Sequence, residues 1–197
     1  YGTTGTPEQF FVQWKDELAT GQLSSGSLLD QPLAQICSKE RLLDLMRNFV
    51  IFDAGHKKVP RQHQYAGIKA AQQRIAQREG GVIWHTQGSG KSILMVLLGK
   101  WLLESDPHAR VLVVTDRDEL DKQIVGVMRN AGVVPDEGAS PHITSRADFV
   151  RKLSDTSPRL LCALIHKFDA SDLDGEPPPI NGRFYVFVDE CHRTQGG

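Results

Sequence analysis

A glycine-rich turn between two apolar segments holds the residues of this chain that are best suited to bind phosphate. The turn reads Thr86-Gln87-Gly88-Ser89-Gly90-Lys91-Ser92. Gly88 and Gly90 carry no Cβ, so backbone N–H groups can approach an anion, and the start of a following helix adds partial positive charge. We expect Lys91 to reach the β- and γ-phosphates of a nucleotide, and Ser92 to bind Mg²⁺ through its hydroxyl. The predicted nucleotide contacts in this turn are Gln87, Gly88, Ser89, Gly90, Lys91 and Ser92.

The turn departs from the strict phosphate-loop pattern G-x-x-x-x-G-K-[ST] at its first position, where His85 replaces glycine. The context of the pattern is kept, because apolar residues at 81–86 precede the turn and an apolar run at 93–98 follows it. An ordinary glycine-rich turn that binds nothing is the alternative interpretation.

A second group of reactive side chains follows the apolar segment 184–188. It reads Asp189-Glu190-Cys191-His192-Arg193. Carboxylates at the carboxyl end of a buried parallel strand lie at the edge of the sheet where ligands bind. Asp189 is therefore predicted to hold Mg²⁺, Glu190 to orient and deprotonate the attacking water, and His192 to couple this site to the rest of the protein. This arrangement favours nucleotide hydrolysis over phosphoryl transfer, and a plain charged turn is the alternative.

Continuous apolar runs predict strands that must position these groups, and the segments between the runs predict helices. The strands are expected at 81–86, 110–115, 160–165 and 184–188, and the helices at about 90–104, 117–131 and 146–154. Continuous runs are typical of strands buried on both faces, and strand-helix alternation is typical of a parallel sheet with right-handed crossovers. The predicted fold class is α/β, with a parallel sheet flanked by helices and preceded by a short helical connector.

The first 58 residues lack this alternation. Apolar residues recur there at helical spacing, in one group at Phe10, Phe11, Trp14 and Leu18 and in a second between Leu42 and Phe49. We therefore predict a helical linker over 1–58 and a nucleotide-binding domain over 59–197. The segment 57–78 contains six Lys or Arg residues and no acidic residue, which predicts either a solvated helix face or a contact with a nucleic-acid backbone.

Composition excludes several classes of protein. The 197 residues are 40% apolar and 24% charged, with 23 basic against 24 acidic side chains, so the chain is of the globular type and its net charge of −1 indicates no particular partner. No apolar run approaches the ~20 residues of a membrane span, and no signal peptide is recognisable, which predicts a cytoplasmic protein without membrane contact. Cys37, Cys162 and Cys191 are widely spaced and are expected to be buried thiols.

Three segments together resemble one known family. They are GVIWHTQGSGKS at 81–92, VVTDRDELDKQI at 113–124 and DECHRTQGG at 189–197. The chain resembles the restriction (R) subunit of type I restriction-modification enzymes, whose motor is a superfamily 2 helicase or translocase. The resemblance implies a RecA-like P-loop NTPase lobe that uses ATP and Mg²⁺ to translocate double-stranded DNA, in complex with modification and specificity subunits.

The resemblance also implies roles for individual residues. Arg61 and Gln64 match an element that reads adenine, and a plain helix surface residue is the alternative for Gln64. Thr115, Asp116 and Arg117 match a turn that contacts the DNA backbone, and helix capping is the alternative for the first two.

The family's nuclease requires an acidic residue two positions before a lysine, and this chain contains no such pair. The resemblance therefore places the nuclease before Tyr1 and the second motor lobe, with its arginine residues, after Gly197. The chain alone is then expected to bind Mg-ATP weakly and to hydrolyse it poorly. A D-E-x-H helicase without a nuclease and a non-catalytic nucleotide-binding module are the alternative functions.

Overall fold

The computed structural model describes residues 1–14, 30–53, 55–86, 88–116, 118–134, 138, 140–165 and 178–189. The chain divides into two compact units, residues 1–98 and 99–197, which are described separately below. The predicted domain boundary at residues 58 and 59 stays a prediction.

The first unit is mostly helical around a small aromatic core. Its elements are η1 (Glu8–Phe10), α1 (Asp30–Ile36), α2 (Lys39–Asn48), β1 (Ile51–Asp53), β2 (His56–Lys58), α3 (Gln62–Ala76) and the first turns of α4 (Lys91–Ser105). Trp14 and Phe49 are buried and both pack against Tyr65 of α3, with ring centroids 5.5 and 4.7 Å apart. These rings join the N-terminal segment and the end of α2 to α3.

Two expectations for this unit are wrong. Residues 51–58, predicted to be helical, form the antiparallel hairpin β1-β2, because Gly55 adopts the left-handed conformation (φ +79°) that a tight reversal requires. The spacing of Phe10, Phe11 and Trp14 predicted a helix, yet within residues 1–14 the structure has a single 3-10 turn, at Glu8–Phe10. The second predicted helix is confirmed by α2, whereas Leu18 lies outside the described residues.

The predicted strand at 81–86 does not form as a strand. Its backbone has no ladder partner among the described residues, and Val82 and Trp84 are 83% and 89% exposed. An apolar run becomes a strand only where a neighbour supplies hydrogen bonds, and the run alone does not specify that neighbour.

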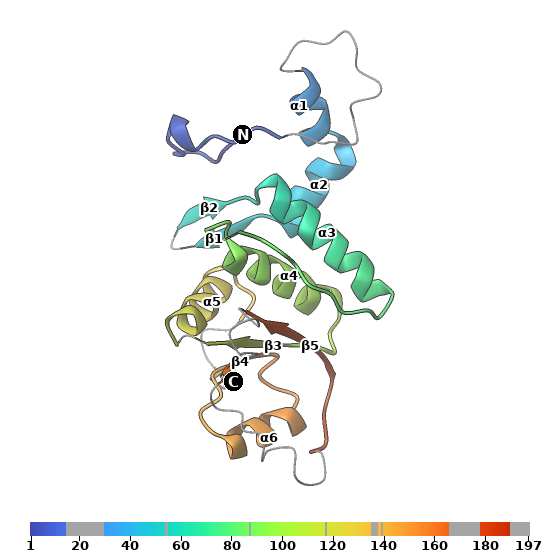
Figure 1. Ribbon diagram of the computed structural model, residues 1–197, viewed down its shortest axis with the longest axis vertical. Coiled ribbons are helices and arrows are strands. Elements are labelled where there is room, and N and C mark those ends of the chain that lie inside the picture. Colours follow the sequence, from blue (N-terminus) through green and yellow to red (C-terminus); the bar gives the residue numbers. More distant parts are fainter. Residues whose placement is uncertain are drawn as a thin grey trace. The chain divides into compact units, whose positions relative to one another are not determined.

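The second unit contains the predicted parallel sheet. Its elements are β3 (Ala109–Thr115), α5 (Asp118–Asn130), α6 (Arg146–Ser154), β4 (Leu160–Leu164) and β5 (Arg183–Val188), together with the last turns of α4. The strand order is β4-β3-β5 and both pairings are parallel, so the expected strands at 110–115, 160–165 and 184–188 are confirmed within two residues. Figure 1 shows α5 and α6 on opposite sides of this sheet, which confirms the α/β class with helices on both faces.

Burial within the sheet falls from the centre toward one edge. Every residue of β3 and β4 is buried, as continuous apolar runs predict. In β5, however, Val186 and Val188 are 53% and 47% exposed, because among the described strands β5 pairs only with β3. The prediction that this strand is buried on both faces is therefore wrong for β5.

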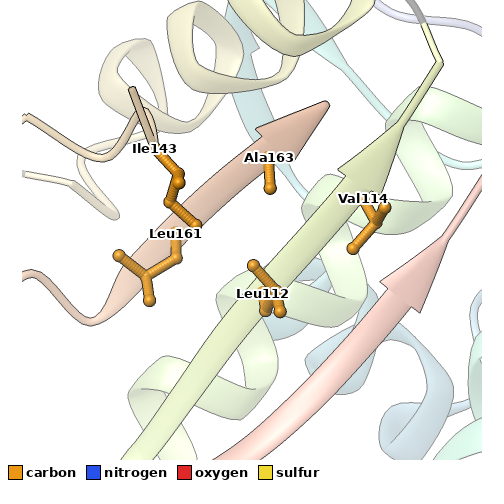
Figure 2. Packing of buried hydrophobic residues seen from close by; sticks show 5 residues of the cluster. All are labelled: Leu112, Val114, Ile143, Leu161 and Ala163. Carbon is orange, nitrogen blue, oxygen red and sulfur yellow. The ribbon is translucent and has the colours of Figure 1, made fainter. Parts of the chain in front are cut away.

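One face of the sheet is packed by a single apolar cluster. Leu112 and Val114 of β3 lie beside Leu161 and Ala163 of β4, and Ile143 extends the cluster from a segment alongside β4 (Figure 2). Phe149 of α6 packs against the cluster. Since successive residues of a strand point to opposite faces, Val111 and Val113 lie on the other face, where both are fully buried.

Arg110 is a buried side chain that joins several loops of the second unit. Its residue is only 2% exposed, and its guanidinium lies over the Phe184 ring, 4.6 Å from the ring centroid. The guanidinium donates, over 2.6–3.1 Å, to the carbonyls of Lys152, Leu153, Asp155, Pro158 and Asn181. Two of these carbonyls belong to the last turn of α6, where a helix leaves its carbonyls without internal partners.

No helix in the described ranges combines the length and apolar character needed to cross a bilayer. Cys162 is buried as expected, whereas Cys37 is exposed, contrary to the expectation. Cys191 lies outside the described residues.

We predict that Arg110→Met lowers the free energy of unfolding by about 3 kcal/mol, because the buried carbonyls lose their donors while the side chain keeps most of its volume. Urea unfolding followed by circular dichroism measures this loss. Arg183→Met is the matched control: Arg183 is exposed and its ion pair with Asp106 lies at the surface, so a much smaller loss is expected. Equal losses in both variants would contradict the role of Arg110.

Asp148 of α6 gives the second unit a pH-dependent contribution to stability. Its carboxylate accepts hydrogen bonds from Thr144 N–H (3.1 Å), Arg151 (2.7 Å) and Lys152 (2.9 Å). Burial raises the pKa of Asp148, but the bonds from Lys152, Thr144 and Arg151 outweigh it and hold the pKa well below its ordinary value of 3.8. The negatively charged carboxylate of Asp148 therefore stabilises the folded state.

We expect Asp148→Asn to destabilise the chain at pH 7 by about 1 kcal/mol, a modest value because nearby solvent screens these pairs. The folded-state pKa is depressed, so the difference from the unchanged chain should be complete above about pH 5 and shrink as the pH falls below about 4. Urea unfolding of both proteins at several pH values tests this, and a difference that grows in acid would refute it.

Candidate functional site

The glycine-rich turn of the first unit forms a backbone loop at the start of a long helix. Gly88 and Gly90 both adopt left-handed conformations (φ +76° and +83°), which explains why glycine stands at these positions. The Ser89 N–H and hydroxyl donate to the Thr86 carbonyl over 3.2 and 2.6 Å and close the turn. Helix α4 begins directly afterwards at Lys91, so the loop is followed by N–H groups that a helix leaves without internal acceptors. This is the arrangement in which a protein backbone binds phosphate.

The first turn of α3 is attached to this loop through Gln64. The Gln64 amide nitrogen donates to the carbonyls of Ser89 (3.0 Å) and Gly90 (3.1 Å), and its amide oxygen accepts from the Arg61 N–H (2.7 Å). Gln64 is only 5% exposed, so the interpretation of Gln64 as a plain surface residue is wrong. A Cβ at position 90 would collide with the Gln64 amide nitrogen, which gives a second reason for glycine there.

His63 also contacts the loop, although the sequence assigned it no role. Its Nε2 lies 3.2 Å from the Ser89 carbonyl oxygen, and its ring lies 5.1 Å from the ring of His85, between centroids. Burial lowers the pKa of His85 below its ordinary value of 6.5, and the charges of His63 and Lys91 lower it further. The lowered pKa favours the neutral form of His85. In the sequence, the only sign that His85 lies at this site is its position next to the glycine-rich turn.

A cleft of about 370 Å³ opens beside the loop within the first unit. Its lining includes Arg61, Gln64 and Gly90 together with Tyr1, Phe10 and Val12 of the N-terminal segment. Ligand pockets of small molecules begin at about 300 Å³, and this one combines apolar side chains with the polar groups of the loop. These residues therefore fit a nucleotide, and nothing in the sequence pattern had indicated the contribution of the N-terminal segment.

The carboxyl ends of the parallel strands bring a second set of predicted residues together in the second unit. Thr115 ends β3, Asp116 follows it, and Asp189 follows β5. The Asp189 N–H donates to the Val114 carbonyl over 3.0 Å, which places Asp189 at the same edge of the sheet as Thr115. Thr115 is fully buried, whereas Asp116 and Asp189 are half-buried. Asp189 is thus a carboxylate at the edge where α/β sheets bind ligands, as predicted.

Four predicted site residues lie outside the described residues: Gln87, Arg117, Glu190 and His192. The loop and Asp189 belong to different compact units, and each is described only within its own unit.

Part of the basic segment 57–78 is used within the protein. Lys58 pairs with Asp53, Lys69 pairs with Asp44 at 3.0 Å, and Arg74 pairs with Glu79 at 3.4 Å. The Nε of Arg74 also donates a hydrogen bond to the Gly80 carbonyl over 2.8 Å. These pairs favour the interpretation of this segment as a solvated helix face over a contact with nucleic acid.

Known proteins similar to this chain are endonuclease subunits of type I restriction enzymes. The HindI endonuclease subunit of Haemophilus influenzae is 30% identical over the whole chain, which corresponds to 20% of that subunit. The SauCOLORF180P subunit of Staphylococcus aureus is 29% identical and the SsaAORF53P subunit of Staphylococcus saprophyticus 28% identical, each over 70% of this chain and 15% of the relative. The chain thus spans about a fifth or less of the length of these relatives.

A family profile, described as SWI2/SNF2 ATPase, matches residues 63–197. The match begins in the first turn of α3, next to Gln64, and includes the phosphate loop, the parallel sheet and Asp189. The fold class predicted from the sequence, a RecA-like α/β domain, agrees with this match. Because the profile covers well over half of the chain, the chain belongs to the SWI2/SNF2 ATPase family.

Proposed function

We propose that this chain is the ATP-binding and ATP-hydrolysing motor lobe of a type I restriction enzyme R subunit, and that it drives translocation of double-stranded DNA before cleavage by a nuclease domain elsewhere in the subunit. The observation that carries the proposal is the loop with left-handed Gly88 and Gly90 at the start of α4. The similar proteins are endonuclease subunits of type I restriction enzymes, which supports the restriction role.

In this proposal the phosphate chain of ATP is bound by the backbone N–H groups of the loop, from Gln87 to Gly90, and by the Lys91 ammonium. The Ser89 N–H has to release the Thr86 carbonyl to take part. Ser92 and Asp189 hold Mg²⁺, which neutralises phosphate charge when it is bound. The adenine lies in the cleft lined by Arg61 and Gln64. The N–H groups are backbone donors fixed in direction, whereas Lys91 contributes its charge. Substitution of Lys91 therefore removes the charge and leaves the backbone donors in place.

Hydrolysis in this proposal is an in-line attack by water. Glu190 accepts a proton from the water, the water oxygen forms a bond to the γ-phosphorus, and the bond from that phosphorus to the β-γ bridging oxygen breaks. ADP and phosphate leave, and Lys91 stabilises the charge on the phosphate oxygens. His192 relays the state of the nucleotide to the remainder of the protein.

The DNA contacts proposed for the second unit are Thr115, Asp116 and Arg117. Thr115 is fully buried in the unbound chain, so its hydroxyl needs a local rearrangement to reach a phosphate. Arg117 offers a charge-assisted bond to the DNA backbone. The modification and specificity subunits are the proposed protein partners.

We expect Lys91→Ala to lower the rate of ATP hydrolysis by the full-length protein at least about 100-fold, because the charge that stabilises the transferred phosphate is lost. Steady-state phosphate release with and without double-stranded DNA measures this rate. Lys39→Ala is the matched control, since Lys39 is an exposed lysine of α2 in the same unit. An unchanged rate in Lys91→Ala would exclude the loop as the hydrolytic site.

Glu190→Gln should separate binding from hydrolysis. The variant keeps ATP affinity within about twofold but loses hydrolysis by about 10²–10⁴-fold, because the amide cannot accept the proton of the attacking water. Equilibrium ATP binding and DNA-stimulated phosphate release on the same preparation give both numbers. Stimulation of the unchanged protein by RNA but not by double-stranded DNA would contradict the restriction role and indicate a helicase.

A further inference from the structure

The carbonyl groups of the phosphate loop are held by side chains from the first turn of α3. Gln64 donates to both the Ser89 and the Gly90 carbonyls, and His63 lies within hydrogen-bond distance of the Ser89 carbonyl. The Gly90 carbonyl also accepts the Leu94 N–H at 3.2 Å, the first hydrogen bond along α4. Two consecutive loop carbonyls are thus fixed in direction by contacts from outside the loop.

Fixing a carbonyl also fixes the N–H group that follows it. A trans peptide unit is planar, and its C=O and N–H point in opposite directions. The carbonyl of Ser89 belongs to the same peptide unit as the N–H of Gly90, and the carbonyl of Gly90 to the same unit as the N–H of Lys91. Because both carbonyls point toward Gln64, both N–H groups point away from α3. There they can donate hydrogen bonds to an anion.

We propose that Gln64 is a positioning residue that prearranges the N–H groups of Gly90 and Lys91 for phosphate, with His63 as a secondary contact to the same loop. This inference rests on the proposed function, since it concerns how the loop binds the triphosphate of ATP. Donors that are already oriented before binding need no reorganisation when the anion arrives. Gln64 thereby contributes to the affinity for the triphosphate whichever base is attached.

This role differs from adenine reading, which the family resemblance implies for Gln64. Both polar atoms of the amide are already engaged, the oxygen by the Arg61 N–H and the nitrogen by the two loop carbonyls. To hydrogen-bond both edges of adenine, the amide has to release the loop. The two roles therefore make opposite predictions for a ligand that has phosphates and no base.

The helix-capping role of Gln64 can be separated from its role toward the loop. Its oxygen stands at the third position of α3 and accepts the N–H of the capping residue Arg61, where Gln and Glu are both favourable. Gln64→Glu keeps this acceptor and removes the donor to the loop carbonyls. Gln64→Ala removes both contacts, and Gln73→Ala changes an exposed glutamine of the same helix as the matched control.

The test is calorimetric titration of the full-length protein and its variants with ATP and, separately, with inorganic tripolyphosphate, both in Mg²⁺. We expect Gln64→Ala to weaken the binding of both ligands by the same factor of about ten, and Gln64→Glu to weaken both at least as much. Thermal melting by circular dichroism should show Gln64→Glu folded like the unchanged chain, and Gln73→Ala should bind both ligands normally.

Loss of ATP affinity in Gln64→Ala with unchanged tripolyphosphate affinity would overturn the positioning role in favour of adenine reading. Unchanged affinity of both Gln64 variants for both ligands would overturn it as well. If the unchanged full-length protein binds neither ligand, the proposed nucleotide site itself fails, which is distinct from a failure confined to the variants.

Discussion

Backbone carbonyls that no helix or strand satisfies need donors from elsewhere, and in this chain long side chains from neighbouring elements supply them. Gln64 does this for the phosphate loop, and Arg110 for the end of α6 and the segments that pack against it. Arg159 does the same for the end of α4, donating to the carbonyls of Leu103 and Ala109 at 2.8 and 3.0 Å. In each case the side chain fixes the path of a segment that regular secondary structure leaves undetermined.

This constraint matters most where the chain is proposed to do chemistry. In the proposed function the loop offers N–H groups to an anion, so its carbonyls have to be satisfied on the other side, and Gln64 is buried there. At the sheet edge the parallel ladder supplies the donor, because the Asp189 N–H is hydrogen-bonded to the carbonyl of Val114. The backbone of the loop is thus held by the Gln64 side chain, and the backbone at Asp189 by a bond to the neighbouring strand.

Membership in the SWI2/SNF2 ATPase family and likeness to type I restriction subunits agree with a motor lobe. The geometry adds a distinction within the site. In the proposed function Lys91 and the glycine-rich backbone bind the phosphates, whereas the cleft lined by Tyr1, Phe10 and Val12 offers apolar surface beside the loop. A residue between these two regions, such as Gln64, can serve either one, which is why affinity for a base-free polyphosphate separates its possible roles.

The sequence by itself determined the elements whose signals are local. The glycines at 88 and 90 and the apolar runs at 110–115 and 160–165 act over a few residues, and each predicted the element found. The segment between two apolar runs predicted the helix at 146–154. Tertiary structure alone decided that residues 81–86 have no ladder partner among the described strands and that Val186 and Val188 of β5 stay exposed. It also decided that Gln64 meets carbonyls 25 and 26 residues away, because such contacts depend on how distant segments pack and leave no periodic pattern along the chain.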